Sequence, residues 1–224
     1  MFKKELNYEP SNSPLNIIFK DPYIIVVDKP SGLLTVPGKK KKLQDSLICR
    51  LKRKFIGTLL VHRLDMDTSG LIIFARTLSA QKKLNEQSEK RSVEKTYIAR
   101  VWGKPLKKEG IIKFPIIADF ENKPKQKICY DNGKESTTKW HLKSVSHFKD
   151  DVFSNLIVNP ITGRSHQIRI HLASINLPIL GDSLYAHEKA FLSSSRLLLH
   201  SKILKIKHPS TDKILIFKSE ESFD

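Results

Sequence analysis

The chain has 224 residues, of which 39% are hydrophobic and 8% aromatic, values that are typical of a folded globular protein and exclude a disordered chain. Its 40 Lys and Arg residues outnumber its 23 Asp and Glu residues, giving a formal net charge of +17. This excess favours a polyanionic partner, nucleic acid before an anionic membrane, although a basic surface that binds nothing is the alternative. No run of 18 apolar residues is present, which excludes a membrane-spanning helix, and the N-terminus lacks the apolar core of a secretory signal.

The two cysteines, Cys49 and Cys129, are far apart in the sequence, as expected for free thiols in a reducing cytoplasm. No Cys/His cluster has the spacing of a zinc site, so we expect no metal. Neither a phosphate-binding GxxxxGK[ST] loop nor a strand-linked GxGxxG is present, so we expect no nucleotide cofactor.

The first quarter of the chain predicts two strands and a helix. Residues 1–14 contain Pro10 and Pro14 and predict an irregular lead-in. The next apolar runs predict strands over Ile17–Phe19 and Tyr23–Val27. Apolar residues at helical spacing predict an amphipathic helix over 43–55. The polar face of this helix is a candidate phosphate-binding stripe that contains Arg50, Lys52, Arg53 and Lys54.

Two short apolar runs, Leu59–Val61 and Leu71–Ala75, predict buried strands joined by a polar segment. A second helix is predicted over 77–90, capped by Thr77 or Ser79, with Leu78 and Leu84 facing inward. Residues 95–103 follow with the composition of a strand that ends at a Gly.

The second half alternates short apolar runs with turns and predicts mostly antiparallel sheet, over 111–117, 127–130, 137–145 and 153–158. A helix is predicted after Ser165 as its N-cap, with Ile168, Leu172 and Ile175 on its buried face. A last strand is predicted over Ile214–Phe217. Because no break in composition divides residues 15–218, we expect one domain there.

The most distinctive segment is the polar connection between the strands at 59–61 and 71–75. It reads His62-Arg63-Leu64-Asp65, then Thr68-Ser69-Gly70. A polar connection held by two buried strands is a common place for chemistry, whereas a solvated loop is the plain alternative. The segment resembles the HRLDxxTSG signature of the RluA-type pseudouridine synthases, whose motif Asp is catalytic, which implies that Asp65 is catalytic here. Asp67 falls on an unspecified position and is interpreted as a turn residue or a solvated charge.

Further segments resemble motifs of the same family. Residues 29–33 are similar to its KPxGL element, which lies beside the active site, and residues 95–103 to its KxYxAxVxG element, whose Tyr packs against the target uracil. The resemblance therefore implies this role for Tyr97. Residues 162–171 resemble TGRxHQIRxH, whose Arg pairs with the catalytic Asp, which implies that Arg164 is the partner of Asp65. The resemblance continues over residues 178–182 and at Tyr185. The resemblance also implies a set of RNA- and substrate-binding residues: Lys29, His62, Arg63, Thr68, Lys95, His166, Gln167 and Arg169.

The resemblance implies an α+β fold, the pseudouridine synthase catalytic core, in which a mixed, mostly antiparallel sheet is flanked by helices and loops around a central active-site cleft. It implies isomerisation of uridine to pseudouridine in structured RNA. Residues 124–130 are similar to a segment of one short family member whose substrates are a 23S rRNA hairpin and a tRNA anticodon stem-loop. Too few residues precede Lys29 to hold the S4 RNA-binding domain that relatives often carry. We therefore expect a single catalytic domain over 15–218, acting as a cytoplasmic monomer without cofactor, metal or membrane.

The chemistry suits an ionised carboxylate, which can attack the sugar as a nucleophile or act by elimination; the sequence leaves both routes open for Asp65. The target base must leave its stack, which costs least in a hairpin loop, and Arg63 is placed to fill the vacated space.

Three alternatives remain from the sequence. The first is the same chemistry on a different tRNA or rRNA uridine. The second is a non-catalytic RNA-binding protein on the same fold. The third is a hydrolase or nuclease that uses His62, His166 or His171, whose spacing indicates neither a triad nor a metal site.

Overall fold

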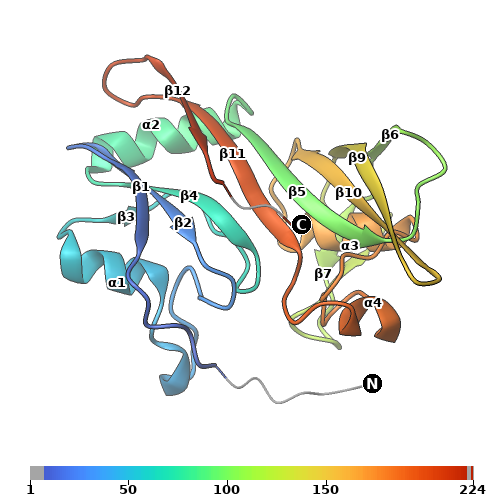
Figure 1. The fold of residues 1–224 in the computed structure, drawn as a ribbon. Coiled ribbons are helices and arrows are strands. Elements are labelled where there is room, and N and C mark those ends of the chain that lie inside the picture. The colour runs from blue at the N-terminus through green and yellow to red at the C-terminus, as the bar shows by residue number, and fades with distance from the viewer. Residues whose placement is uncertain (1–7, 221–222, 224) are drawn as a thin grey trace.

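A computed structural model describes residues 8–220 and 223 (Figure 1). Its helices are a short 3-10 turn, η1 (Lys41–Leu43), and α1 (Leu47–Lys54), α2 (Leu78–Glu89), α3 (Gln167–Ser174) and α4 (Glu188–Leu192). Its strands are β1 (Asn16–Lys20), β2 (Ile24–Lys29), β3 (Leu59–Leu60), β4 (Ser69–Ala75), β5 (Glu94–Trp102), β6 (Glu109–Ile112), β7 (Ile116–Ala118), β8 (Gln126–Ile128), β9 (Thr138–Phe148), β10 (Asp151–Pro160), β11 (Leu199–Lys207) and β12 (Ile214–Lys218).

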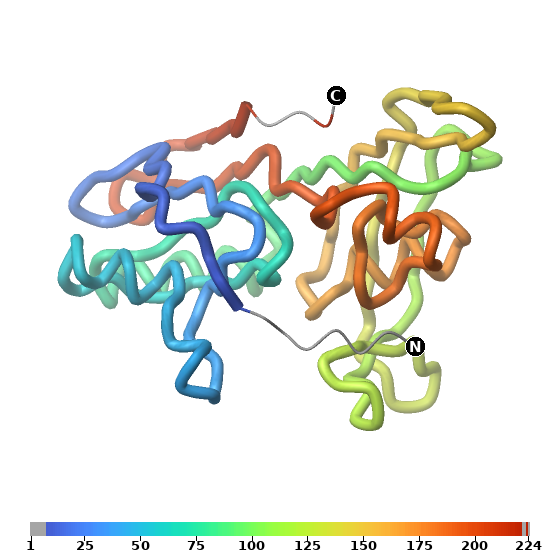
Figure 2. Tube along the Cα trace, turned by 60° about the horizontal axis from the view of Figure 1, so that its bottom comes forward, coloured from blue at the N-terminus to red at the C-terminus, as the bar shows by residue number. Residues whose placement is uncertain are grey.

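The strands form one large sheet and one small hairpin. The large sheet has the order β1-β2-β4-β11-β5-β10-β9-β6, with β12 paired to β11 and β3 paired to β4, and β7 and β8 form the separate hairpin. Every pairing is antiparallel except that of β4 with β11. Figure 2 shows β5 and β11 running between the two halves of the molecule. The expected α+β fold with a mixed, mostly antiparallel sheet is confirmed.

The centre of the large sheet is covered on both faces, which explains the continuous apolar runs of β2 and β4. On one face, Val27, Ile72 and Phe74 pack with Leu51 of α1 and Leu172 of α3. On the other face, alternate residues of the same strands pack against α2. The two central strands are therefore rigid supports for the loops at their ends.

The register of β4, β11 and β5 places the segment after Asp65 next to Tyr97. Gly70 lies opposite Ser201 in the parallel pair, and Ser201 lies opposite Tyr97 in the antiparallel pair. Since neighbouring strands are about 4.8 Å apart, Tyr97 is two strand spacings from the start of β4. Gly70 has φ +107°, and a Cβ there would lie 2.4 Å from the Ser201 carbonyl oxygen. Only glycine permits this close approach.

Four local predictions are wrong. The run Leu59–Val61 is not a buried strand, since β3 covers only Leu59–Leu60 and both residues are half-buried. The predicted helix over 43–55 starts four residues later, because the Ser46 hydroxyl accepts the Cys49 amide and caps α1 there, while residues 41–43 form the 3-10 turn. Leu78 is 75% exposed rather than inward-facing, since it occupies the first position of α2 after its cap, Thr77.

Ser165 does not cap α3. The N-cap is His166, which has a left-handed backbone with φ +54° and makes no side-chain cap bond. Ile168 and Leu172 are buried as predicted. Of the expected irregular lead-in, residues 8–14 carry no helix or strand, and residues 1–7 lie outside the described residues.

We predict that Gly70→Ala lowers the free energy of unfolding by about 2 kcal/mol or more, because the new methyl group meets the backbone of β11 and the residue keeps a positive φ. Chemical denaturation measures this change. Gly163→Ala is the matched control, since a Cβ at Gly163 has nothing within 4 Å, and its midpoint should stay that of the wild type. Equal midpoints for the two variants would contradict the prediction.

Candidate active site

Asp65 lies in the loop between β3 and β4, with its side chain 24% exposed. Its two carboxylate oxygens face two different cationic or donor groups. Oδ2 is 3.6 Å from Nη1 of Arg169, and Oδ1 is 3.9 Å from Nε2 of His166. Both partners come from the start of α3, so this helix sets the electrostatic surroundings of the carboxylate.

Arg169 is held by a second carboxylate, that of Asp182. Its Nε and Nη2 donate to the two oxygens of Asp182 at 2.8 and 2.7 Å, the two-pronged geometry that a guanidinium matches best. Both side chains are almost fully buried. Burial works against the charge of Arg169, yet the hydrogen bonds and charge of Asp182 outweigh it and raise the pKa of Arg169. Arg169 is therefore a fixed cation with one amino group left to face Asp65.

The prediction that Arg164 pairs with Asp65 is wrong. Arg164 is exposed on the turn before α3, and its Nε donates to the Glu135 carbonyl oxygen at 3.3 Å. Arg169, five residues later and inside the helix, occupies the partner position instead. Arg169 had been predicted as an RNA contact, but its burial and its bonds to Asp182 make it a partner of carboxylates.

The loop that carries Asp65 is held along its length by residues 29–35. The Lys29 ammonium group donates to the carbonyl oxygens of Pro30, Leu33 and Met66, each at 2.8 Å. Thr35 donates its hydroxyl to the Leu64 carbonyl and accepts the Leu64 amide. The backbone on both sides of Asp65 is thus fixed by side chains from another segment.

Two predicted RNA contacts are structural groups instead. Lys29 is 0% exposed and all three of its donors are used; burial lowers its pKa to about 7. Gln167 is also buried. Its amide group donates to Thr137 and Thr138 and its oxygen accepts from Thr162 and the Arg164 amide, so it fastens the turn before α3. Neither side chain has a group left for RNA.

The C-terminal end of the same loop is fixed by a buried chain of hydrogen bonds. The Ser69 hydroxyl lies 2.9 Å from Nδ1 of His200 and accepts from Nη1 of Arg196. Nε2 of His200 lies 2.8 Å from the Ser219 hydroxyl, which donates to Asp28. Burial, together with nearby Lys202 and Arg196, lowers the pKa of His200 to about 4. A neutral His200 therefore joins β4, β11, β2 and the segment after β12.

Tyr97, Lys95 and His62 lie near the Asp65 loop. Tyr97 is buried, and burial together with the charge of Asp65 raises its pKa to about 12, although its bond to Ser201 opposes this. Burial lowers the pKa of Lys95 to about 8. Burial and the charge of Lys95 also lower the pKa of His62. His62 accepts the Ile73 amide through Nε2, and within the described residues its buried Nδ1 has no hydrogen-bond partner.

The remaining predicted residues divide by exposure. Arg63 is exposed beside Asp65, and Thr68 is buried in the same loop. His171 is buried, and its two ring nitrogens lie 2.8 Å from the Thr138 hydroxyl and 2.9 Å from the Phe114 carbonyl oxygen. Within residues 8–220 and 223, no three His, Cys, Asp or Glu side chains gather as a metal site would require.

Sequence reasoning missed the roles of Asp182 and Tyr185, and it interpreted Asp67 as a turn residue or a solvated charge. Asp182 holds Arg169, and Tyr185 lies with its ring 5.4 Å from the Arg169 guanidinium carbon. Burial raises the pKa of Asp67, against the lowering effect of Arg169 and Lys29, which places it in the same charge cluster. Asp182 and Tyr185 belong to a segment that resembles a family element, and this resemblance was the available signal; for Asp67 there was none.

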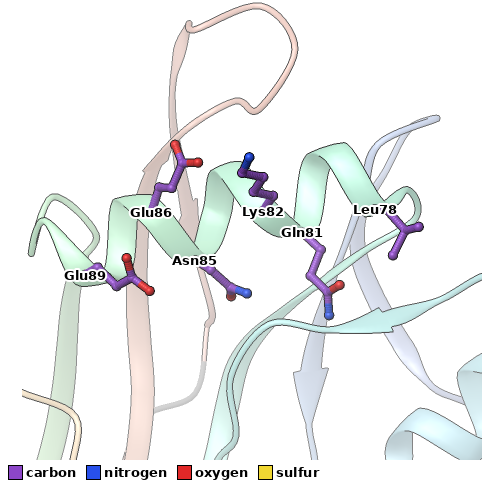
Figure 3. Close-up of a pocket in the computed structure, with 6 residues that line it drawn as sticks. All are labelled: Leu78, Gln81, Lys82, Asn85, Glu86 and Glu89. Atoms are coloured by element: carbon purple, nitrogen blue, oxygen red, sulfur yellow. The ribbon is translucent and has the colours of Figure 1, made fainter.

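A hollow of about 520 Å³ lies along the outside of α2, lined by Leu78, Gln81, Lys82, Asn85, Glu86 and Glu89 (Figure 3). Its side chains come from one helix and diverge from one another instead of meeting at a point (Figure 3). It includes none of the predicted site residues. No helix of the described residues is long and apolar enough to cross a membrane.

Solved structures with the same fold are RNA-modifying enzyme domains by title. Human RNA Pseudouridylate Synthase Domain Containing 1 matches with a TM-score of 0.78 at 24% identity, over 95% of this chain and 86% of that one. Human RNA Pseudouridylate Synthase Domain Containing 4 matches with a TM-score of 0.73 at 23% identity, over 93% and 89%. These matches define the fold as that of pseudouridine synthases.

Sequence comparison gives the family. The profile described as RNA pseudouridylate synthase matches residues 23–174. The Dual-specificity RNA pseudouridine synthase RluA of Escherichia coli (strain K12) is 43% identical over 218 residues, which cover 97% of this chain and 98% of the relative. Its counterpart in Yersinia pestis is 45% identical over 207 residues, covering 92% and 99%. The chain belongs to the RNA pseudouridylate synthase family and is an RNA pseudouridine synthase.

We predict that Arg169→Lys lowers kcat at least tenfold, since a lysine cannot hold Asp182 at two points and face Asp65 at once. Arg164→Lys should keep kcat within about twofold, because this exposed side chain lies apart from the carboxylate. Steady-state conversion of a uridine-containing hairpin at saturating RNA, with enzymes whose folding is checked by denaturation, measures both. The reverse order of effects would restore Arg164 as the partner of Asp65.

Proposed function

We propose that this protein converts uridines in the loops of tRNA and 23S rRNA stem-loops to pseudouridine, with Asp65 as the catalytic carboxylate. The observation that carries the proposal is the Asp65 carboxylate in the family's motif, with one oxygen facing Arg169 and the other facing His166. The dual specificity named for relatives that match over nearly their full length supports two RNA substrates.

The reaction breaks the bond from N1 of uracil to C1′ of the ribose, turns the base, and joins C5 to C1′. The hydrogen on C5 is lost and N1 gains one, so no atom is added or removed overall. A carboxylate serves by attacking C1′ or by assisting elimination from the sugar, and both routes require it to be ionised. The cation Arg169, 3.6 Å away, stabilises that negative charge at a partly buried position.

The target uridine must be turned out of its stack, which favours a hairpin loop over a duplex. In the proposal Tyr97 packs against the turned-out uracil, and exposed Arg63 fills the space it leaves. His62 and Lys95 contact the substrate. The net charge of +17 supports contacts with phosphates on the surrounding surface. We further propose that the protein acts as a monomer in the cytoplasm, without a cofactor.

The sequence alone also left open a non-catalytic RNA-binding role on the same fold. Membership of the chain in the RNA pseudouridylate synthase family argues against that role. Asp65 and Tyr97, which stand in the family's motifs, and the fixed cation beside Asp65 argue against it as well.

We predict that Asp65→Asn lowers the rate of pseudouridine formation by at least about a thousandfold, because the amide can neither attack the sugar nor carry negative charge. RNA affinity should change by less than about threefold, since Arg169 keeps its bonds to Asp182. Mass spectrometry of anticodon stem-loop and 23S hairpin transcripts measures the product.

The control variant is Asp150→Asn, which alters an exposed carboxylate and should act like the wild type. The control RNA carries cytidine in place of the loop uridines. Turnover by Asp65→Asn would remove Asp65 from the mechanism, and absence of product with wild-type protein would contradict the proposed RNA substrates.

A pH prediction follows from Lys95, whose pKa of about 8 reflects burial. Only the protonated amine attracts phosphate. As pH rises through about 8, Lys95 of the free protein loses its proton, and its contact with an incoming RNA phosphate is lost. We expect KM for the RNA to rise severalfold between pH 7 and 9. Lys95→Arg keeps its charge throughout and should show a flat KM over this range, as steady-state kinetics at constant ionic strength would reveal. Parallel profiles for the two proteins would exclude Lys95 as a phosphate contact.

A further inference from the structure

The hydroxyl of Tyr185 lies between the hairpin β7–β8 and the start of α3. It accepts the backbone amide of Gln126, the first residue of β8, at 2.7 Å, and lies 2.9 Å from Nδ1 of His166. The two rings meet edge to face, with centroids 5.7 Å apart. Figure 1 shows β7 beside α3, so the hairpin is a neighbour of the helix whose first residues face Asp65.

The donors in this arrangement can be assigned. A backbone amide only donates, so the Tyr185 oxygen accepts from Gln126. Within the described residues the tyrosine hydroxyl has no other acceptor than Nδ1 of His166, so it donates there. Burial above all, and the charge of Arg169, lower the pKa of His166 despite the opposing effect of Asp65, which favours the neutral ring. Its single proton is therefore on Nε2, the nitrogen that faces Oδ1 of Asp65 at 3.9 Å.

The backbone conformation of His166 is also unusual. Its φ of +54° lies in the left-handed region, which non-glycine residues adopt uncommonly. No side-chain cap bond to α3 accounts for this conformation. The contacts that the ring does make are to Tyr185 and Asp65.

We propose that Tyr185 and His166 are positioning residues: a hydrogen-bonded relay from hairpin β7–β8 presents the Nε2 proton of His166 to Asp65. Arg169 faces the other carboxylate oxygen at 3.6 Å, so the two side chains attract the two oxygens and together favour one rotation of the carboxylate plane. This proposal rests on the proposed role of Asp65 as the catalytic carboxylate. The hairpin at which the relay starts bears exposed Lys123 and Lys127. In the proposal, RNA that binds this hairpin therefore affects the orientation of the Asp65 carboxylate through Tyr185 and His166.

The first test is kinetic. Tyr185→Phe keeps the ring beside Arg169 and removes the hydroxyl, so we expect kcat to fall about tenfold with KM for a stem-loop transcript unchanged. Tyr23→Phe, on the turn between β1 and β2, is the matched control and should retain wild-type kcat. In a His166→Gln background, Tyr185→Phe should have no further effect on kcat, because the relay is already broken. Unchanged kcat for Tyr185→Phe, or effects that multiply, would overturn the proposal, and a rise in KM alone would assign Tyr185 to RNA binding.

The second test needs no activity. In ¹⁵N NMR of the free protein, the His166 ring, assigned by its absence in His166→Gln, should show Nδ1 as the unprotonated nitrogen and Nε2 as the protonated one. Tyr185→Phe should shift this ring toward a mixture of tautomers, whereas Tyr23→Phe should not. A wild-type ring protonated on Nδ1 would overturn the relay. If wild-type protein makes no pseudouridine while the Nε2 tautomer is found, the proposed function fails and the relay stands.

Discussion

The structure depends on one buried cation, Arg169, and on how its donors are divided between two carboxylates. Asp182 takes two of its nitrogens at short distance, and Asp182 itself also accepts the amides of Leu184 and Tyr185. A buried charge is costly unless it is paired and hydrogen-bonded, and removing one partner from such a pair costs about 3–5 kcal/mol. Asp182 meets this requirement by itself. The contact of Arg169 with Asp65 at 3.6 Å is therefore not needed to balance the buried cation, and in the proposed function it serves the reaction.

The large sheet brings this cation and the Asp65 loop together from distant parts of the chain. The parallel pairing of β4 with β11, next to the antiparallel pairing of β11 with β5, sets Gly70, Ser201 and Tyr97 in one row. β10, the neighbour of β5, leads into α3 through the turn that Gln167 fastens. Residues of the loop before β4 thus meet residues of the helix after β10, although β11 and β5 lie between these two strands in the sheet. Sites built on such rigid supports hold their geometry better than sites on free loops.

The sequence predicted the strands and the motifs better than the partners within the site. Runs such as Leu71–Ala75 are buried on both faces, so their composition reveals them directly. The choice between Arg164 and Arg169 depends on where the helix starts and which side chain enters the core, and single-sequence patterns leave that open. The roles of Lys29 and Gln167 were equally hard to predict, because a polar residue in a motif can either contact RNA or hold the backbone in place. Long-range hydrogen bonds decide between these roles, and they are not encoded in local spacing.

Two neutral histidines, at opposite sides of the Asp65 loop, illustrate how the site gains its order without RNA. Ser219 donates to Asp28, so His200 donates to Ser219 through Nε2 and accepts the Ser69 proton at Nδ1. This chain of donors begins at the guanidinium of Arg196 and ends at a carboxylate, an order in which each bond polarises the next. In the relay proposed above, the hydroxyl of Tyr185 sets the tautomer of His166 in the same way. Both rings have lowered pKa values, caused first by burial, which favours their neutral forms, and the hydrogen bonds of each ring then select its tautomer. A carboxylate held by such fixed dipoles needs little reorganisation when the uridine arrives, and preorganisation of this kind is what electrostatic catalysis requires.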